Sequence, residues 1–359
     1  MNRHSTVQSA HRKRRAAQTT TTAACVLGLG LVAAPTIGLS ADVTVGAGMR
    51  ASFSDTNYSG PTKDVSDFSL DNARLYISGK VTDQIGFMFN TQYSTGGASG
   101  SNVTVMDAAA QFSFSPSFNI WAGRFLPPSD RSNLYGPYYA SNWGVYQDGV
   151  QDGYPSGAVG RDDGILYWGQ FGKLKLSAGA FDVPQTSGNK DVLYAARAQV
   201  DLWDAEDGYY LNGTYYGAKD LLAFGVAGQV VGSDQAYSAD VLLEKKLAGA
   251  GVVTLEAEYA NYDGLGGYAG TKSDGYYGLV GYLFPTPVGI GKFQALVKYG
   301  TATYTYSPTL KEDHDTLELN LNYLIKDFNA RISLFYIDHS YNKASTDSSQ
   351  IGIGLQIQM

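Results

Sequence analysis

The chain has 359 residues, of which 43 are glycine, 27 tyrosine and 15 phenylalanine, and 16% are charged. This composition excludes an intrinsically disordered chain, a collagen and a coiled coil. The formal net charge is −7, and it becomes −12, with 21 bases and 33 acids, once the five bases of the first forty residues are set aside. Nucleic acid requires a basic surface for its phosphates, so we expect no nucleic-acid partner.

The first 41 residues have the form of a secretory signal peptide. The basic run 12–15 is followed by the apolar and small residues 23–34 and by small residues up to Ser40 and Ala41, near which we expect cleavage. The apolar run is shorter than the ~20 residues that a membrane-spanning helix needs. Cys25, the one cysteine, lies inside this segment, so the exported chain has no thiol for a disulfide, a zinc site or redox chemistry.

From residue 42 onwards the apolar residues recur at every second position, which predicts β-strands. For example, Leu317, Leu319 and Leu321 alternate with Glu318 and Asn320. The alternating segments are about 9–12 residues long, which exceeds the usual strand length in soluble sheets and suits a tilted strand that crosses a bilayer. In a soluble sandwich the apolar faces would meet in a core, whereas in a membrane barrel they face lipid and the polar faces line a wet lumen.

Three further features favour the membrane barrel over the soluble sandwich. Aromatic residues lie near predicted strand ends, as at a membrane interface, among them Phe118, Tyr209, Tyr259 and Tyr299. The last alternating segment reaches the end of the chain, so it can pair with the first and leave no open edge. Short connections alternate with long polar ones, which we place at 54–67, 126–163, 261–274, 305–313 and 339–347.

Seventeen candidate strands begin near residues 43, 68, 85, 103, 118, 163, 173, 192, 208, 221, 236, 251, 274, 291, 314, 327 and 348. Bacterial single-chain barrels have an even number of strands, so we expect one of the assignments between residues 209 and 245 to be wrong. The sequence therefore predicts a single all-β domain over 42–359, a transmembrane antiparallel β-barrel of sixteen strands, with eighteen as the alternative. Either size leaves an aqueous channel.

Four short segments carry a resemblance to a known family: 72–80 (NARLYISGK), 107–112 (DAAAQF), 122–128 (AGRFLPP) and 136–143 (GPYYASNW). Together they resemble the phosphate-selective porin O/P family of Gram-negative outer membranes. The resemblance implies a homotrimer of sixteen-stranded channels, in each of which a long third loop folds into the lumen and narrows it. The stretch 126–163 matches that loop by its position and length.

The sequence departs from the anion-selective members of this family, which carry a ladder of basic residues along the pore. The charged residues that we assign to the lumen are the bases Arg50, Arg124, Lys175, Arg197, Lys298 and Arg331 and the acids Asp107, Asp201, Asp240, Glu256, Glu258 and Glu318. A phosphate channel needs a surplus of basic groups, whereas rings of acids select cations. We therefore transfer the fold but not the phosphate selectivity, and expect a weak cation preference.

The charged residues of the long loop are candidates for the pore constriction, where opposed charges would set a transverse field. They are Asp130, Arg131, Asp148, Asp152, Arg161, Asp162 and Asp163. The alternative is a solvated surface loop. Long irregular loops are uncommon unless they are functional or disordered, which favours the constriction in part.

No pattern in the sequence predicts a catalytic, metal or cofactor site. His314 and His339 fall near one rim of the predicted barrel with carboxylates close by, a set that zinc can use, but solvated rim residues are the simpler interpretation. The segment 264–269 matches a dinucleotide-binding glycine pattern but lacks the helix that must follow it. We expect no cofactor and no enzyme activity.

The sequence thus predicts a passive channel of the Gram-negative outer membrane for small hydrophilic solutes or ions, surrounded by outer-membrane lipid. Three alternatives stay open. The first is an anion- or phosphate-selective porin, and the second is an outer-membrane barrel hydrolase, which would need a positioned nucleophile and base. The third is a soluble exported β-sandwich.

Overall fold

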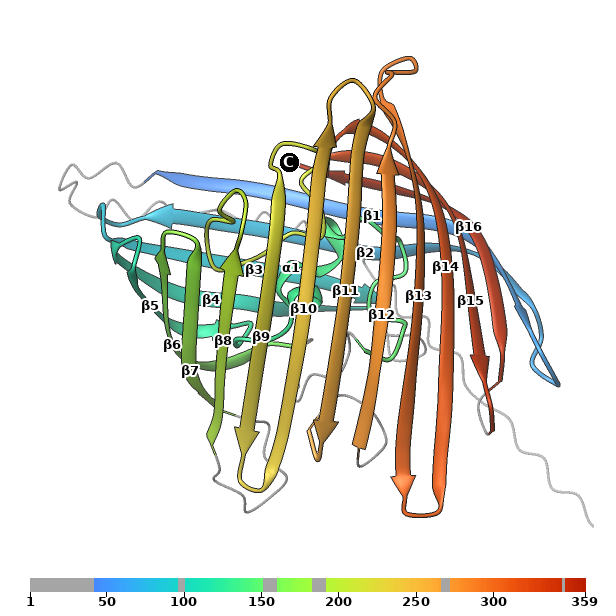
Figure 1. Ribbon diagram of the computed structural model, residues 1–359, viewed down its shortest axis with the longest axis horizontal. Helices are drawn as coiled ribbons and strands as arrows, with labels where there is room; N and C mark the ends of the chain where they lie inside the picture. Colours follow the sequence, from blue (N-terminus) through green and yellow to red (C-terminus); the bar gives the residue numbers. More distant parts are fainter. Residues whose placement is uncertain (1–41, 96–100, 151–159, 183–191, 266–271, 344–345) are drawn as a thin grey trace, which may run out of the picture. The chain divides into compact units, whose positions relative to one another are not determined.

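The computed structural model describes residues 42–95, 101–150, 160–182, 192–265, 272–343 and 346–359. Within these residues, sixteen antiparallel strands form one closed barrel in chain order (Figure 1). The strands are β1 (Val43–Tyr58), β2 (Val65–Lys80), β3 (Ile85–Thr95), β4 (Ser101–Ser115), β5 (Phe118–Phe125), β6 (Asp162–Phe171), β7 (Leu174–Asp182), β8 (Val192–Asp201), β9 (Leu221–Val231), β10 (Asp234–Leu247), β11 (Gly251–Asp263), β12 (Lys272–Leu283), β13 (Lys292–Ser307), β14 (Leu310–Lys326), β15 (Ala330–Tyr341) and β16 (Ser348–Gln358). A short helix, α1 (Arg131–Tyr139), lies between β5 and β6. In the part of the chain that the structure describes, no helix is long and apolar enough to cross a membrane.

The barrel closes where the first strand meets the last. Gly48 lies opposite Gln358 and Arg50 lies opposite Gln356, and the backbones of Ala47 and Met359 exchange two hydrogen bonds of 2.9 Å. Every described strand therefore has a neighbour on both sides, which satisfies its backbone groups without help from water. The predicted sixteen-strand antiparallel barrel is confirmed, and so is its closure by the terminal strand.

The superfluous strand in the prediction is the one that begins near residue 208. The segment 202–220 joins β8 to β9 and contains no strand. Its backbone leaves the extended conformation at Gly208, Tyr216 and Gly217, which have φ values of 85°, 51° and 82°. Its closely spaced tyrosines suggested a strand, but three positive φ values within ten residues, one of them at a tyrosine, turn the backbone away from an extended path.

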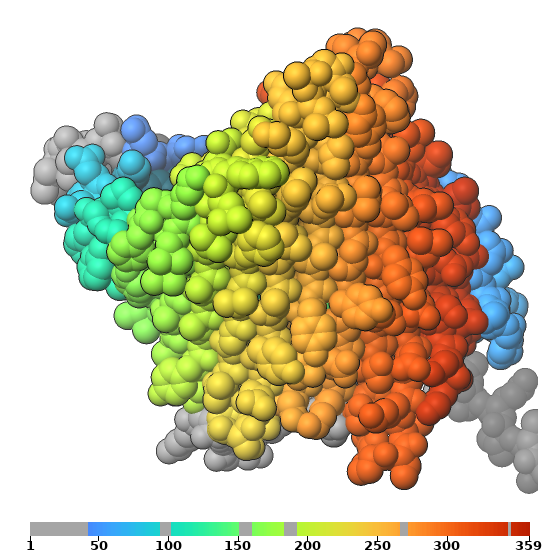
Figure 2. Space-filling view, in the orientation of Figure 1, coloured from blue at the N-terminus to red at the C-terminus, as the bar shows by residue number. Residues whose placement is uncertain are grey.

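Side chains alternate between the two faces of the barrel wall as the sequence predicts. In β14, Leu319 is 44% exposed on the outside, whereas Glu318 next to it is 1% exposed inside. Phe118, Tyr259 and Tyr299 are exposed on the outer surface, in keeping with an aromatic girdle. Tyr209 is not part of that girdle, because it is buried inside the barrel. Figure 2 shows one side of the outer surface, where the strands from β6 to β15 form a continuous wall.

The two rims of the barrel carry different connections. The chain ends of β1 and β16 lie at one rim with the tight turns 116–117, 172–173 and 248–250, and we call it the turn rim. The opposite rim, the loop rim, carries the connection between β5 and β6, but it also carries two tight turns, 232–233 and 308–309. Two of the long loops predicted there, 54–67 and 305–313, are mostly strand, since their polar residues continue the ladders of β1 with β2 and of β13 with β14.

The outer face gives a test of whether the barrel lies in lipid. Leu319→Lys, in the middle of β14, should lower the free energy of unfolding by ~2–4 kcal/mol in lipid vesicles, because a lysine at the bilayer midplane loses its hydration. Ile357→Lys, on the same outer face but at the turn-rim end of β16, should cost only ~0–1 kcal/mol. Urea titration of both variants measures the difference, and equally small costs would mean that the outer face meets water.

Candidate functional site

The connection between β5 and β6 folds into the lumen, as predicted. We call its described residues, 126–150 and 160–161, the lumen loop. Its helix α1 begins at Asp130, whose carboxylate accepts a 2.8 Å hydrogen bond from the backbone N–H of Asn133, and nearly all of its residues are buried inside the barrel. The helix kinks at Gly136, which has a φ of 64° that favours glycine. The buried polar groups of this loop therefore depend on partners in the loop itself, in the barrel wall or in neighbouring chain.

Acidic side chains of the wall hold the lumen loop from one side. Glu258 on β11 accepts hydrogen bonds from the backbone N–H and the hydroxyl of Ser132, at 3.2 and 2.9 Å. Glu318 on β14 accepts 2.8 Å hydrogen bonds from the backbone N–H groups of Trp143 and Gly144. These acids face the lumen, as predicted, but each is buried and bonded to the loop.

Ion pairs fasten further parts of the loop to the wall. Lys298 on β13 lies 2.5 Å from the carboxylate of Asp148, and Arg161 lies 3.4 Å from Asp107 on β4. Arg331 on β15 donates 2.8 and 3.1 Å hydrogen bonds to the carbonyl oxygens of residues 140 and 141. Because all of these groups are nearly inaccessible to solvent, the pairing satisfies charges that would otherwise be costly to bury.

The segment 202–220, which we call the inserted segment, enters the lumen from the turn rim. Glu206 and Thr214 are completely buried in it, and Thr214 donates a 2.6 Å hydrogen bond to Glu244 on β10. The segment also contacts the lumen loop directly, since the backbone N–H of Gly213 donates to the carbonyl oxygen of Tyr139 at 3.0 Å. Two inserted pieces of chain therefore meet inside the barrel, one from each rim.

Arg131 and Glu206 form the charged contact between these two pieces. The guanidinium of Arg131 donates two hydrogen bonds to the carboxylate of Glu206, at 2.9 and 2.6 Å, and a third to the carbonyl oxygen of Asn212 at 2.9 Å. Burial by itself would raise the pKa of Glu206, but the charge of Arg131 and its hydrogen bonds lower that pKa to about 2. Glu206 and Asp240 likewise hold the pKa of Arg131 well above its ordinary value, against the effect of burial.

An apolar core fills much of the space between the inserted pieces and the wall. Leu134 of the lumen loop and Leu211 of the inserted segment belong to it with Trp121 and Phe125 of β5. Trp121 makes edge-on contacts with Phe125 and Tyr209, with ring centroids 5.8 and 5.2 Å apart. This part of the lumen is packed like a protein interior and offers no passage.

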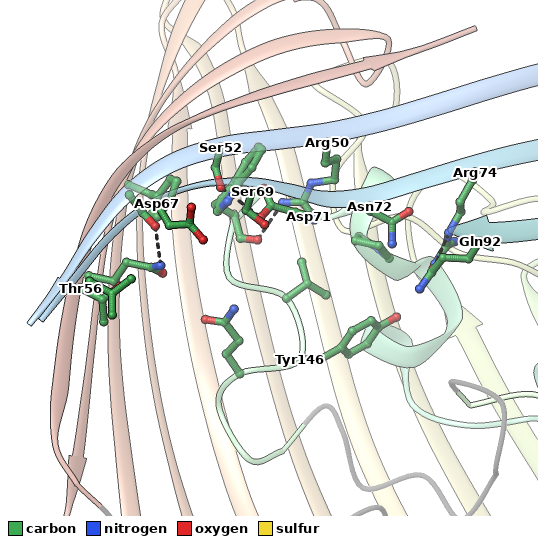
Figure 3. Close-up of a pocket in the computed structure, with 18 of the residues that line it drawn as sticks. Arg50, Ser52, Thr56, Asp67, Ser69, Asp71, Asn72, Arg74, Gln92 and Tyr146 are labelled. Atoms are coloured by element: carbon green, nitrogen blue, oxygen red, sulfur yellow. Dashed lines mark hydrogen bonds between the residues drawn. The ribbon is translucent and has the colours of Figure 1, made fainter. Parts of the chain in front are cut away.

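Open space lies instead along the wall formed by β1, β2 and β3. An outer cavity of about 410 Å³ faces the loop rim, and its lining includes Ser52, Asp67, Ser69 and Asp71 (Figure 3). An inner cavity of about 330 Å³ is lined by parts of this wall, the lumen loop and the inserted segment, including Tyr76, Asn90, Leu134, Tyr139, Leu211 and Asn212. The lining of the outer cavity is mainly polar, whereas that of the inner cavity combines charged and amide side chains with tyrosines and leucines.

The two cavities meet at Arg74 of β2, which lines both. Its guanidinium donates hydrogen bonds of 3.0 and 2.7 Å to the side-chain oxygen of Gln92 and lies 5.6 Å from the ring centroid of Tyr138. The neighbouring residues Gly136 and Pro137 of the lumen loop each line one of the cavities. Arg74 and the kink of α1 thus form a neck between the cavities.

The structure brings most of the predicted site residues together inside the barrel. Of those assigned to the lumen, Arg50, Lys175, Arg197, Asp107, Asp201, Asp240, Glu256, Glu258, Lys298, Glu318 and Arg331 are buried on its inner side. Of the loop residues, Asp130, Arg131, Asp148, Arg161 and Asp162 are buried there as well. Asp152 lies outside the described residues. No finding tests whether these charges constrict the pore, so that role stays a prediction.

Arg124 and Asp163 lie elsewhere than expected. They form a 2.7 Å ion pair with side chains that are 37% and 59% exposed. Arg124 lies opposite Ala108, and Asp163 shares its face of β6 with the exposed Ile165, so both project from the outer side of the wall. The assignment of Arg124 to the lumen and of Asp163 to the constriction is therefore corrected. Strand β5 carries apolar side chains on both faces, which hides the difference between inside and outside.

Sequence reasoning missed the inserted segment and the neck. Arg74 lies in a segment singled out for its resemblance, but it was not assigned to the pore. The run of acids and glycines around Glu206 and Gly208 is a turn signal that argued against a strand there.

His314 and His339 do lie together, with ring nitrogens 3.0 Å apart. Among the described residues, no group of three or more histidines, cysteines or carboxylates could hold a metal ion.

Comparisons with known proteins support the fold. No sequence family and no curated protein matches this chain. The barrel is similar to OmpF of Salmonella typhi, with a TM-score of 0.62, 12% identity, and coverage of 88% of this chain and 97% of that one. It is also similar to an anion-selective porin of Comamonas acidovorans (TM-score 0.60, 11% identity, 89% and 100% covered) and to the outer membrane channel DcaP of Acinetobacter baumannii (0.57, 13%, 89% and 97%). At these identities the likeness shows a shared barrel fold.

The pair between Arg131 and Glu206 predicts a pH-dependent stability. The pKa of Glu206 is lowered on folding, so its contribution is fully present above its ordinary pKa and is lost as the pH falls through about 2. Glu206→Gln should lower the free energy of unfolding at neutral pH by ~3–5 kcal/mol, because it leaves Arg131 buried with a weaker partner. Unfolding measured from pH 7 to pH 2 should show the two proteins converging at low pH, and a constant difference would contradict the assignment.

Proposed function

We propose that this protein is a porin of the Gram-negative outer membrane, a passive diffusion channel for small hydrophilic solutes and ions. The observation that carries the proposal is the pair of cavities along β1, β2 and β3, both with charged side chains in their lining, inside a closed barrel whose outer face is apolar. Open space with polar groups in its lining, inside a barrel with an apolar outer face, suits the entry of water and small solutes. Solutes would pass from the outer cavity to the inner one beside Arg74.

The names of similar structures support this function. One is an anion-selective porin and another is an outer membrane channel. By analogy with bacterial barrels, the turn rim would face the periplasm and the loop rim the outside of the cell. Export by the signal peptide at 1–41 and assembly into a homotrimer belong to the same proposal.

The charge preference of the path should be weak. The charged residues that line the two cavities are three bases, Arg50, Arg74 and Arg161, and three acids, Asp67, Asp71 and Asp107. Most of the other acids inside the barrel are bonded to the lumen loop or the inserted segment, but their surplus still adds a negative field. We therefore propose a weak cation preference. An anion-selective channel is the second candidate, because Arg74 occupies the neck, where a charge acts most strongly on a passing ion.

Replacement of Arg74 tests the path. Arg74→Ala removes the largest side chain at the neck, so single-channel conductance in planar bilayers should rise by roughly half or more. Arg124→Ala is the matched control, because this arginine lies on the outer side of the wall, and its conductance should equal that of the wild type. Equal conductance in all three proteins would place the passage elsewhere.

The sign of the charge preference is measured as a reversal potential across a KCl gradient. The wild type should show a weak preference for potassium over chloride. The double variant Asp67→Asn/Asp71→Asn should shift the reversal potential towards chloride, because these two acids are exposed at the entrance to the outer cavity. A clear chloride preference in the wild type would instead support the anion-selective alternative.

A further inference from the structure

We propose that the inserted segment 202–220 is a second constriction that sets the size limit of the channel from the turn rim, and that the pair between Arg131 and Glu206 holds it in place. This inference rests on the proposed channel function. The limiting width of the inner cavity would then be set by a connection at the turn rim, where the other connections are two to eight residues long.

The inserted segment lies where neighbouring pairs of strands are joined by short turns. Strands β6, β8 and β10 all run towards the turn rim, and the turns after β6 and β10 are confined to 172–173 and 248–250. After β8 the chain instead crosses the lumen before it reaches β9. Tyr210, Leu211 and Asn212 line the inner cavity, whose other side is formed by Tyr76, Asn90 and Asp107 of the wall. The segment therefore fixes how far that cavity extends from the wall.

Hydrogen bonds attach the inserted segment to the wall and to the lumen loop. It is tied to β10 by Glu244, which accepts hydrogen bonds from the hydroxyl of Thr214 and from the backbone N–H groups of Tyr215 and Gly217, at 2.6, 2.9 and 2.7 Å. It is tied to the lumen loop by two backbone hydrogen bonds, from Leu211 to Leu134 at 3.3 Å and from Gly213 to Tyr139 at 3.0 Å. The segment is thus held at two places and does not hang loosely in the lumen.

Glu206 is the charged centre of this attachment. Besides Arg131, it accepts hydrogen bonds from the hydroxyl of Tyr215 at 2.6 Å and from the side chain of Gln199 on β8 at 2.7 Å. Arg131 in turn is the first residue of α1, the helix whose kink lies at the neck. The same contact therefore joins β8, the inserted segment and α1. Loss of one partner of a buried ion pair leaves the other uncompensated, and local opening then relieves the cost.

Conductance and solute exclusion in planar bilayers test the proposal with the full mature chain. Glu206→Ala should raise single-channel conductance by about two-fold or more and admit larger polyethylene glycols, because released chain no longer fills the lumen. Asp207→Ala is the matched control: this neighbouring carboxylate is 79% exposed and pairs with Lys219 near the surface, so conductance should not change.

Two further variants distinguish release of the segment from misfolding. Leu134→Cys/Leu211→Cys joins the lumen loop to the segment by a disulfide, and the exported chain has no other cysteine. Added to Glu206→Ala, the oxidised pair should restore wild-type conductance, and reduction should raise it again. A second variant replaces 205–217 with Gly-Ser and carries Arg131→Met and Glu244→Gln, because both of these buried charges lose partners when the segment is removed. It should conduct more than the wild type.

Conductance and a size limit equal to the wild type in both Glu206→Ala and the shortened variant, each shown to be folded by circular dichroism, would overturn the role of the segment while leaving the channel function intact. A silent wild type with a conducting shortened variant would mean that the segment closes the channel, which supports its role as the constriction. Absence of conductance in every protein would overturn the channel function and the inference together.

Discussion

The structure depends on one constraint: in lipid, every backbone N–H and C=O group must find its partner within the protein. A strand with a free edge cannot satisfy this requirement, and the pairing of β1 with β16 removes the last edge. Closure in turn divides the side chains into two sets. Those that point outwards are mainly apolar and exposed, and those that point inwards are mainly polar and must be satisfied by water or by other parts of the chain.

The protein meets that second requirement in two ways. On the side of the lumen formed by β4 to β16, it fills the space with the lumen loop and the inserted segment, and wall residues such as Glu258, Glu318 and Arg331 bind the polar groups of these pieces. On the side formed by β1, β2 and β3, it leaves cavities lined by serines, aspartates and arginines. The proposed passage therefore runs beside one wall and not along the barrel axis.

Burial also changes the role of the charged residues inside the barrel. Charges inside a porin are usually taken as a field that acts on passing ions, and a count of them suggests the selectivity. Here Glu206, Asp240 and Glu256 lie among packed side chains and bind other residues. Their main role is therefore to hold the inserted chain and the wall together. The charges with access to the cavities are fewer and nearly balanced, which is why the proposed preference is weak.

Much of the fold could be predicted from the sequence, because period-two alternation gives the strands and an even count gives the closed barrel. The entry of the lumen loop followed from its length and from the resemblance of the flanking segments. The inserted segment could not be recognised in this way, since Tyr209, Tyr210 and Tyr215 resemble a strand until the backbone angles at Gly208 and Gly217 are known. The apolar–polar pattern also fails to mark the two faces of β5, because Trp121 packs inside and Phe118, also apolar, faces outwards.

Alternation can assign a side chain to a face of the wall, but it cannot name its partner. The contact between Arg131 and Glu206 joins two connections that are far apart in the sequence, and only their shared entry into the lumen brings them together. Most of the candidate charges were therefore found, while their roles and the neck at Arg74 required the three-dimensional structure.

Chemical access to the wall of β1 to β3 tests the account most directly, because the exported chain contains no cysteine to react in the background. Ser69→Cys would place a thiol in the outer cavity, and Ser333→Cys would place one on β15, where the side chain is fully buried. A charged, membrane-impermeant methanethiosulfonate reagent should reduce the single-channel conductance of Ser69→Cys and leave that of Ser333→Cys unchanged. Reaction and block at Ser333→Cys without any effect at Ser69→Cys would contradict the proposed passage.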